Sequence, residues 1–143
     1  MTVNQVSVFL ENTKGRICSV AEALKANNIN MIGISIADTA DFGILRIVVA
    51  EPEKAYDVLK KNGFMVELTE VLAISVDDQP GGLADAFKIF NDNEIEIEYL
   101  YAVKRAADGK AVLVVKTPDV DHAAALANTK GVKLLTKEEF YSL

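Results

Sequence analysis

The fold is decided by the stretch Glu11-Asn12-Thr13-Lys14-Gly15-Arg16-Ile17, which returns 66 positions later as Asp77-Asp78-Gln79-Pro80-Gly81-Gly82-Leu83. With the same shift, the sequence matches itself without a gap from Val6 to Pro52. Self-similarity at a fixed spacing identifies the unit of structure. The chain therefore contains two copies of one module, and we expect a first domain at residues 1–70 and a second at residues 71–143.

Apolar periodicity gives both copies the same order of elements. In the first copy it predicts strands at 6–10, 29–36, 42–49 and 64–68, with helices beginning at Ile17 and Pro52. In the second copy the same order predicts elements at 72–76, 83–91, 95–103, 111–116, 118–128 and 132–135. Strand, helix, strand, strand, helix, strand is the order of a ferredoxin-like α+β module, an antiparallel sheet with two helices on one face. Thr136 followed by Glu139 predicts a capping box and a short terminal helix.

Composition and charge exclude several classes of function. The 143 residues carry a net charge of −6, and the basic residues are scattered among acids, which argues against nucleic-acid binding. No apolar run reaches the roughly 18 residues of a membrane span, and no secretory signal is visible at the N-terminus. The single cysteine, Cys18, excludes an internal disulfide. We therefore expect a cytoplasmic protein, and a homodimer because modules of about 60–70 residues are marginal alone.

The loop between the first strand and the first helix of each copy is the candidate site. It ends in glycine and opens a helix, where unpaired N–H groups and the helix dipole suit a carboxylate or a phosphate. Asn12 and Asp78 stand beside these glycines and are placed to bind the opposite end of a small zwitterion. Asn30 and Glu96 open the second strand of each copy, at a sheet edge that we expect to lie near the loop. A glycine before a helix is also ordinary turn chemistry.

These segments resemble ACT domains. The loop Asp78-Gln79-Pro80-Gly81-Gly82-Leu83 is similar to the D-x-P-G-x-L loop of that family, and Glu11 to Ile17 resembles its E-N-x-P-G-x-L variant. Asn28-Ile29-Asn30-Met31 is similar to the N-I-N segment that starts the family's second strand. The resemblance covers nearly the whole chain, as two tandem ACT domains with no catalytic domain attached.

The resemblance implies a regulatory protein that binds a small molecule, most often an amino acid, between paired domains. Lys14 replaces the loop proline of the first copy, and Glu94 and Glu96 replace the two asparagines of the N-I-N segment in the second. We therefore expect two unequal sites, of which the first copy's loop binds a ligand carboxylate better. Carried over residue by residue, the resemblance implies ligand-binding residues Asn12, Gly15, Arg16, Ile17, Asn30 and Met31 in the first copy, and Asp78, Gly81, Gly82, Leu83 and Glu96 in the second.

Other functions remain open at this stage. The first alternative is an assembly or interaction module that acts through its sheets and has lost its ligand. The second is an enzyme, but the sequence has no G-x-S-x-G, metal cluster or paired histidine and carboxylate, so we expect no catalysis, no cofactor and no metal. Nucleotide binding is a weaker possibility, because the sequence contains neither of the glycine-rich phosphate-binding motifs, G-x-x-x-x-G-K-S/T and G-x-G-x-x-G. Because the sequence shows no effector domain, we expect ligand binding to act on another, unknown protein, or the protein to serve as a carrier of the ligand itself.

Several chemically suggestive residues have simpler interpretations. Cys18 is expected to be structural or half-buried, and His122 to lie at the surface. The acids at 94, 96 and 98 alternate with isoleucines, which favours a solvated strand face, with Glu96 as the exception worth testing. Tyr99 and Tyr101 are expected to cover a partner sheet rather than a ligand ring.

Overall fold

The two copies form two compact units that share one strand. The computed structural model describes residues 1–11, 13–39, 41–105 and 108–143. The first unit consists of Asn4–Thr69, and the second consists of Glu70–Leu143 together with Met1–Val3.

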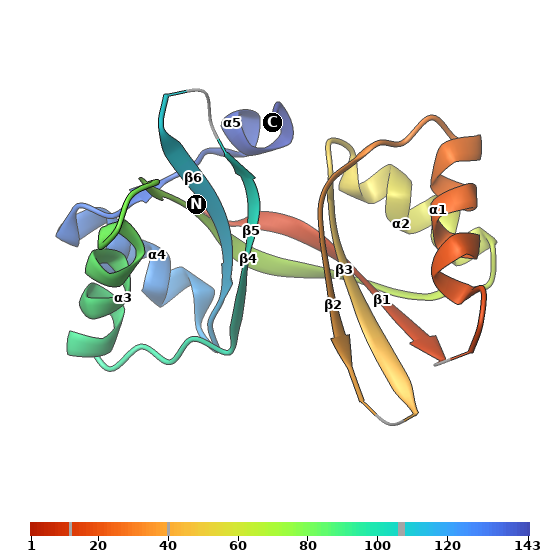
Figure 1. The fold of residues 1–143 in the computed structure, drawn as a ribbon, viewed down its shortest axis with the longest axis horizontal. Coiled ribbons are helices and arrows are strands. Elements are labelled where there is room, and N and C mark those ends of the chain that lie inside the picture. The colour runs from red at the N-terminus through yellow and green to blue at the C-terminus, as the bar shows by residue number, and fades with distance from the viewer. Residues whose placement is uncertain (12, 40, 106–107) are drawn as a thin grey trace. The chain divides into compact units, whose positions relative to one another are not determined.

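The first unit is an antiparallel sheet with two helices on one face (Figure 1). Strand β3 pairs with β2 on one side and with β1 on the other, and β1 lies next to β4, so β2 is an edge strand. The elements are β1 (Val3–Glu11), α1 (Arg16–Ala26), β2 (Met31–Asp38), β3 (Phe42–Val49), α2 (Pro52–Lys61) and the start of β4 (Met65–Asp77).

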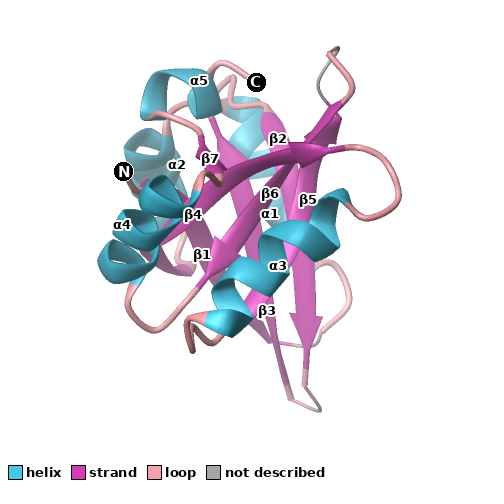
Figure 2. Ribbon diagram, turned by 90° about the vertical axis from the view of Figure 1, so that its left-hand side faces the viewer, coloured by secondary structure: helices cyan, strands magenta, loops and turns pink. Residues whose placement is uncertain are grey.

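The second unit repeats this arrangement. Strand β4 pairs with β6 on one side and with the short β7 on the other, where Figure 2 shows β7 beside it, and β6 pairs with the edge strand β5. Its further elements are α3 (Gly82–Asp92), β5 (Tyr99–Arg105), β6 (Lys110–Lys116), α4 (Val120–Lys130), β7 (Lys133–Leu134) and α5 (Lys137–Tyr141). The predicted order of elements is therefore confirmed in both units.

Equivalent residues build the two cores, because alternation on a strand and the helical period each direct side chains to one face. In the first unit the core contains Val6, Val8, Leu10, Val20 and Leu24. The same positions of the second unit, 66 residues later, supply Leu72, Ile74, Val76, Ala86 and Phe90. The sequence repeat is thus a repeat of core positions.

The strands predicted at 64–68 and 72–76 are one continuous strand, β4, so the prediction of two separate strands is wrong. Thr69, Glu70 and Val71 join them. None of these residues is a glycine or proline that would break a strand, and Thr and Val favour extended backbone. The first and second units are consequently connected without a linker.

Two predicted boundaries in the second unit are also wrong. The strand predicted from Ile95 begins at Tyr99, because Tyr99 pairs with Lys116, the last residue of β6, and β6 extends no further to pair with the residues before Tyr99. The acids at 94, 96 and 98 therefore do not share a strand face, although all are exposed. The helix predicted from Pro118 begins at Val120, because the Asp119 side chain caps it by accepting a hydrogen bond from the His122 N–H at 2.9 Å.

The terminal helix α5 carries the predicted capping box. The Thr136 hydroxyl accepts from the Glu139 N–H at 3.1 Å, and the Glu139 carboxylate accepts from the Thr136 N–H at 2.8 Å. The hydrogen bond from the Thr136 backbone lowers the pKa of Glu139. Phe140, in the same helix, is fully buried, so α5 contributes to the packing of the fold. No helix in the described part of the chain is long and apolar enough to cross a membrane.

Left-handed backbone at two equivalent positions gives a first testable prediction. Asn28 and Glu94 follow the C-caps of α1 and α3 with φ of 56° and 57°. Asn tolerates this region, whereas it costs other side chains roughly 1–2 kcal/mol. We expect Glu94→Asn to raise the free energy of unfolding by up to about 1 kcal/mol in urea denaturation. The reciprocal Asn28→Glu variant should lower it, and equal stability of both variants and the wild type would contradict this interpretation.

Candidate functional site

The loop of the first unit presents bare backbone at the start of α1. Gly15 is the N-cap residue, with φ of 90°, and a Cβ built on it would meet no atom within 4 Å. Its carbonyl accepts hydrogen bonds from the N–H and the hydroxyl of Ser19, each at 2.9 Å. Thr13 and Lys14 are exposed, so a ligand can reach the glycine from solvent. Asn12, predicted to bind the ligand, lies outside the described residues.

The first two residues of α1 differ in environment. Arg16 lies with its guanidinium carbon 4.7 Å from the centre of the Phe64 ring, a cation–π geometry. The Nε atom of Arg16 is buried and has no hydrogen-bond partner among the described residues. Ile17 is 48% exposed, which is unusual for an isoleucine in the first turn of a packed helix. Both predicted residues therefore lie beside Gly15. The Arg16 side chain packs against Phe64 of the first unit, whereas the Ile17 side chain faces solvent.

The loop of the second unit has the same backbone form and the opposite charge. Gly81 is the N-cap of α3, with φ of 94°, and the Asp78 N–H donates to the Gly109 carbonyl at 2.9 Å. Asp77 forms an ion pair with Lys110, whose hydrogen bond to Asp77 raises the pKa of the lysine. Asp78 and Leu83, both predicted to bind ligand, line a cavity of about 410 Å³ beneath this loop.

The second half of each predicted site lies at the other end of the first helix. Asn30 and Met31 line a cavity of about 400 Å³ beside the C-terminal end of α1. Glu96 is exposed and lies between α3 and β5, outside any strand.

The strand register separates these residues from the loops. Met31 pairs with Val49 at the end of β3, whereas Glu11, which leads into the loop, pairs with Phe42 at its start. Seven residues of strand separate these levels, about 23 Å at roughly 3.3 Å per residue. The expectation that Asn30 lies near the loop is therefore wrong within one unit.

The second unit shows the same separation. Asp77 pairs with Lys110 at the start of β6, and Tyr99 pairs with Lys116 at its end, so Asp77, which leads into the Gly81 loop, and Tyr99, which follows the segment of Glu96, lie about 20 Å apart along the sheet. Neither unit brings its two groups of predicted ligand-binding residues together on its own.

The remaining reactive residues, Cys18 and His122, both lie at the surface. Cys18 is exposed, so the expectation of a half-buried thiol is wrong. His122 is exposed in α4, as predicted. Within residues 1–11, 13–39, 41–105 and 108–143, no group of three or more His, Cys, Asp and Glu side chains could hold a metal ion.

One feature near the second loop was not found from the sequence. A cavity of about 270 Å³ lies between the first turns of α3 and the start of β7, with Asp85 and Lys110 in its lining. The only signal in the sequence is the alignment of Gly82 with Arg16, which marks a difference in side chain between the two copies at the start of their first helices.

Comparison with known proteins places this architecture in a class. The family model described as "ACT domain pair" matches residues 1–143. Protein BT0572 from Bacteroides thetaiotaomicron is similar over 100% of this chain and 98% of that chain, with 39% identity and a TM-score of 0.92. No curated protein matches.

More distant structures share the fold. The regulatory subunit of aspartate kinase from Thermus thermophilus, in a ligand-free form, has a TM-score of 0.61 at 14% identity and covers 88% of this chain and 91% of that one. The corresponding subunit from Thermus flavus has a TM-score of 0.58 at 17% identity, with 90% and 92% covered.

The two ferredoxin-like units, each with a glycine loop at the start of its first helix, match a family of paired ACT domains, which is a family of regulatory domains. The chain belongs to the ACT domain pair family, which confirms the resemblance inferred from its loops.

Proposed function

We propose that this chain is a regulatory protein that binds a free amino acid at the interface between ACT domains, taken as residues 1–70 and 71–143. The observation that carries the proposal is the pair of glycine N-caps, Gly15 and Gly81, each with open space above the backbone at the start of a helix of eleven residues. Helix N-termini of this kind attract a carboxylate. Membership of a regulatory domain family supports the same function.

The charges of the two loops support unequal roles. Lys14 and Arg16 flank Gly15, whereas Asp77 and Asp78 precede Gly81. In the proposed site the first loop holds the ligand carboxylate through Gly15 and Arg16, with Ile17 against its side chain. The second loop, through Asp78, Gly81, Gly82 and Leu83, suits the ammonium end better, as does the carboxylate of Glu96.

A second copy of the chain supplies the residues that one unit keeps apart. β2 is an edge strand that carries no charge before Asp38 and exposes Ile34 and Ile36 at 49% and 51%, so it lacks the usual protection against edge pairing. Antiparallel pairing of two β2 strands sets the start of one beside the end of the other. In this proposed homodimer, Asn30 and Met31 of the second copy lie at the loop end of the sheet, where the Asn30 amide can complete the site.

A thermal-shift screen against the twenty amino acids, inorganic phosphate and nucleotides tests the proposed function. An amino acid present at 100 times its dissociation constant should stabilise the protein by about 2.7 kcal/mol, a rise in Tm of several degrees for a chain of this size. A rise with phosphate or a nucleotide and with no amino acid would contradict the proposal.

Charge reversal at the two glycines tests the assignment of the loops. We expect Gly15→Asp to weaken amino-acid binding at least tenfold, a change of about 1.4 kcal/mol, because the new carboxylate repels that of the ligand. Gly15→Asn, of the same shape without the charge, should bind more tightly than Gly15→Asp in isothermal titration calorimetry.

Gly81→Asp is the matched control, since Gly81 has nearly the same φ and equally open surroundings. The assignment is wrong if Gly15→Asp leaves the affinity unchanged while Gly81→Asp abolishes binding.

The alternative is an assembly module that acts through its sheets without a ligand. The exposed Ile34 and Ile36 on an edge strand favour it, as does the replacement of the loop proline by Lys14. In that case no amino acid changes Tm, while substituting Ile34 with Lys still breaks the dimer in sedimentation experiments. A protein partner, allosteric output and a cytoplasmic location stay predictions from the sequence.

A further inference from the structure

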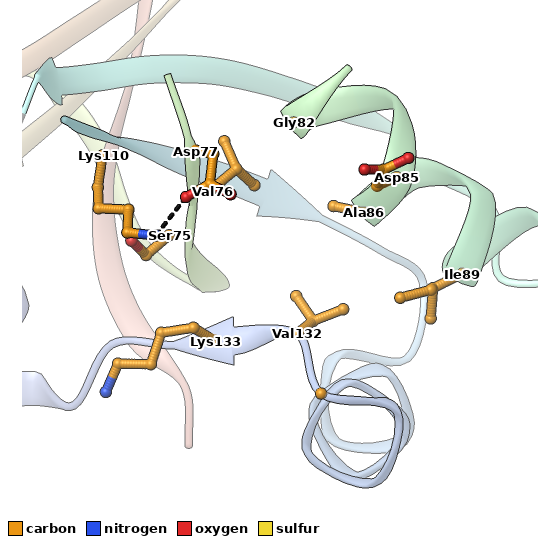
Figure 3. Close-up of a pocket in the computed structure, with 11 residues that line it drawn as sticks. Ser75, Val76, Asp77, Gly82, Asp85, Ala86, Ile89, Lys110, Val132 and Lys133 are labelled. Carbon is orange, nitrogen blue, oxygen red and sulfur yellow. Dashed lines mark hydrogen bonds and ion pairs between the residues drawn. The ribbon is translucent and has the colours of Figure 1, made fainter. Parts of the chain in front are cut away.

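We propose that the cavity between α3 and β7 in the second unit binds an alkylguanidinium cation. Its volume is about 270 Å³, and α3 contributes Asp85, Ala86 and Ile89 to its wall. Figure 3 shows Val132, which immediately precedes β7, opposite Ala86 and Ile89, with Asp85 on the same helix as those two residues. The site lies wholly within the second unit and does not rest on the proposed amino-acid site.

The cavity exists because β7 is short. Ser75 pairs with Lys133, the first residue of β7, and just before it the chain leaves α4 at Gly131, with φ of 82°. Among the described residues, the pairing of β4 with β7 ends at Ser75, and Val76 and Asp77 beyond it line the cavity. Gly82 forms bare wall above them, since its place against Asp77 leaves no room for a side chain.

The first unit shows what fits in such a place. Gly15 and Gly81 are both left-handed N-caps, so Arg16 and Gly82 are the equivalent first residues of α1 and α3. The other wall is equivalent as well, because the Phe64 N–H donates to the carbonyl five residues earlier at 3.1 Å and the Val132 N–H does the same at 2.9 Å. Arg16 and Phe64 therefore correspond to Gly82 and Val132.

In the first unit the chain fills this place with its own cation. The guanidinium carbon of Arg16 lies 4.7 Å from the centre of the Phe64 ring, with Nε buried. In the second unit Gly82 has no side chain and Val132 is smaller than phenylalanine, and the corresponding place is the cavity. The first unit thus acts as an internal template for a guanidinium group between a helix start and a strand start.

The charges around the cavity favour a cation. Asp77 is neutralised by Lys110, and Lys133 pairs with Glu139 at 3.4 Å while extending away from the α3 wall (Figure 3). Asp85, the counterpart of Ser19 in the first unit, forms no ion pair among the described residues. One carboxylate beside an apolar wall of Ala86, Ile89 and Val132 suits a cationic head on an alkyl stem.

The test compares 1-butylguanidinium with 1-butylurea, a neutral compound of the same shape, by amide chemical-shift mapping of the full chain. We expect saturable shifts at Asp85, Ala86 and Val132 with butylguanidinium, and at least fivefold weaker binding of butylurea. Equal binding of the two compounds, shifts located instead at Asp78 and Leu83, or no saturable shift would overturn the proposal. Saturation of the same amides by inorganic phosphate alone would overturn it too, by showing an anion site.

Two variants make the test sharper. Asp85→Asn should weaken butylguanidinium binding about three- to fivefold, a modest change because the carboxylate is exposed. Asp121→Asn is the matched control, since Asp121 is an exposed acid in the first turn of α4 and does not line the cavity. Equal affinities of the two variants would overturn the assignment of Asp85, and with it the charge argument for the site.

Discussion

The Phe90→Ala variant is expected to unfold with a free energy about 3–5 kcal/mol lower than the wild type, the largest effect that we predict for a single substitution. Phe90 is fully buried in the core of the second unit, and it is among the largest side chains there. Its removal leaves a cavity that neighbouring strands cannot fill. Because whole domains are stable by only about 5–15 kcal/mol, this variant should retain little stability. Urea denaturation at 25 °C measures the difference.

Phe87→Ala is the matched control for Phe90→Ala. Phe87 lies on the same helix but is only half-buried, so its truncation should cost clearly less. Leu24→Ala, at the position equivalent to Phe90 in the first unit, should cost about 2–5 kcal/mol. Equal losses from Phe87→Ala and Phe90→Ala would show that α3 packs through a different face.

Gly82→Ala is expected to lower the free energy of unfolding by about 1–3 kcal/mol, the cost of forcing atoms into a filled space. A Cβ at this position would lie 2.1 Å from the carbonyl oxygen of Asp77 and 3.0 Å from its carbonyl carbon. Both are backbone atoms of β4, so relief requires the loop to move away from the sheet. Thermal and chemical denaturation of the variant give the magnitude.

Arg16→Ala provides the comparison for Gly82→Ala. Arg16 occupies the equivalent position in α1 and already carries a Cβ, so truncation creates no clash and removes mainly the contact with Phe64, worth roughly 0.5–1 kcal/mol. If Gly82→Ala left the free energy of unfolding unchanged, the close approach of the loop to β4 would be contradicted.

The sequence repeat predicted the fold well because the core positions repeat. Val6, Val8 and Leu10 alternate, and Val20 and Leu24 follow the helical period, so their shared face could be read without a structure. The ends of strands that depend on a neighbouring strand could not be predicted from this periodicity. The late start of β5 at Tyr99 depends on where β6 ends, and the continuity of β4 depends on strands contributed by both units.

The candidate site was predictable only in part. The left-handed glycines Gly15 and Gly81 follow from local turn chemistry, which the loop sequences contain. The distance of about 23 Å between the loop and Asn30 follows from strand register, which is a property of pairing and not of the motif. The cavity beside Asp85 depends on the length of β7, and only the unlike pair of Arg16 and Gly82 pointed to it.

Amide chemical-shift mapping with each of the twenty amino acids is the decisive experiment for the proposed binding of a free amino acid at the glycine loops. We expect saturable shifts for one or two amino acids at Gly15, Arg16 and Ile17, together with shifts at Asn30 and Met31 from the second half of the site. No saturable shift with any amino acid, or shifts confined to residues outside both loops and the starts of β2 and β5, would contradict it.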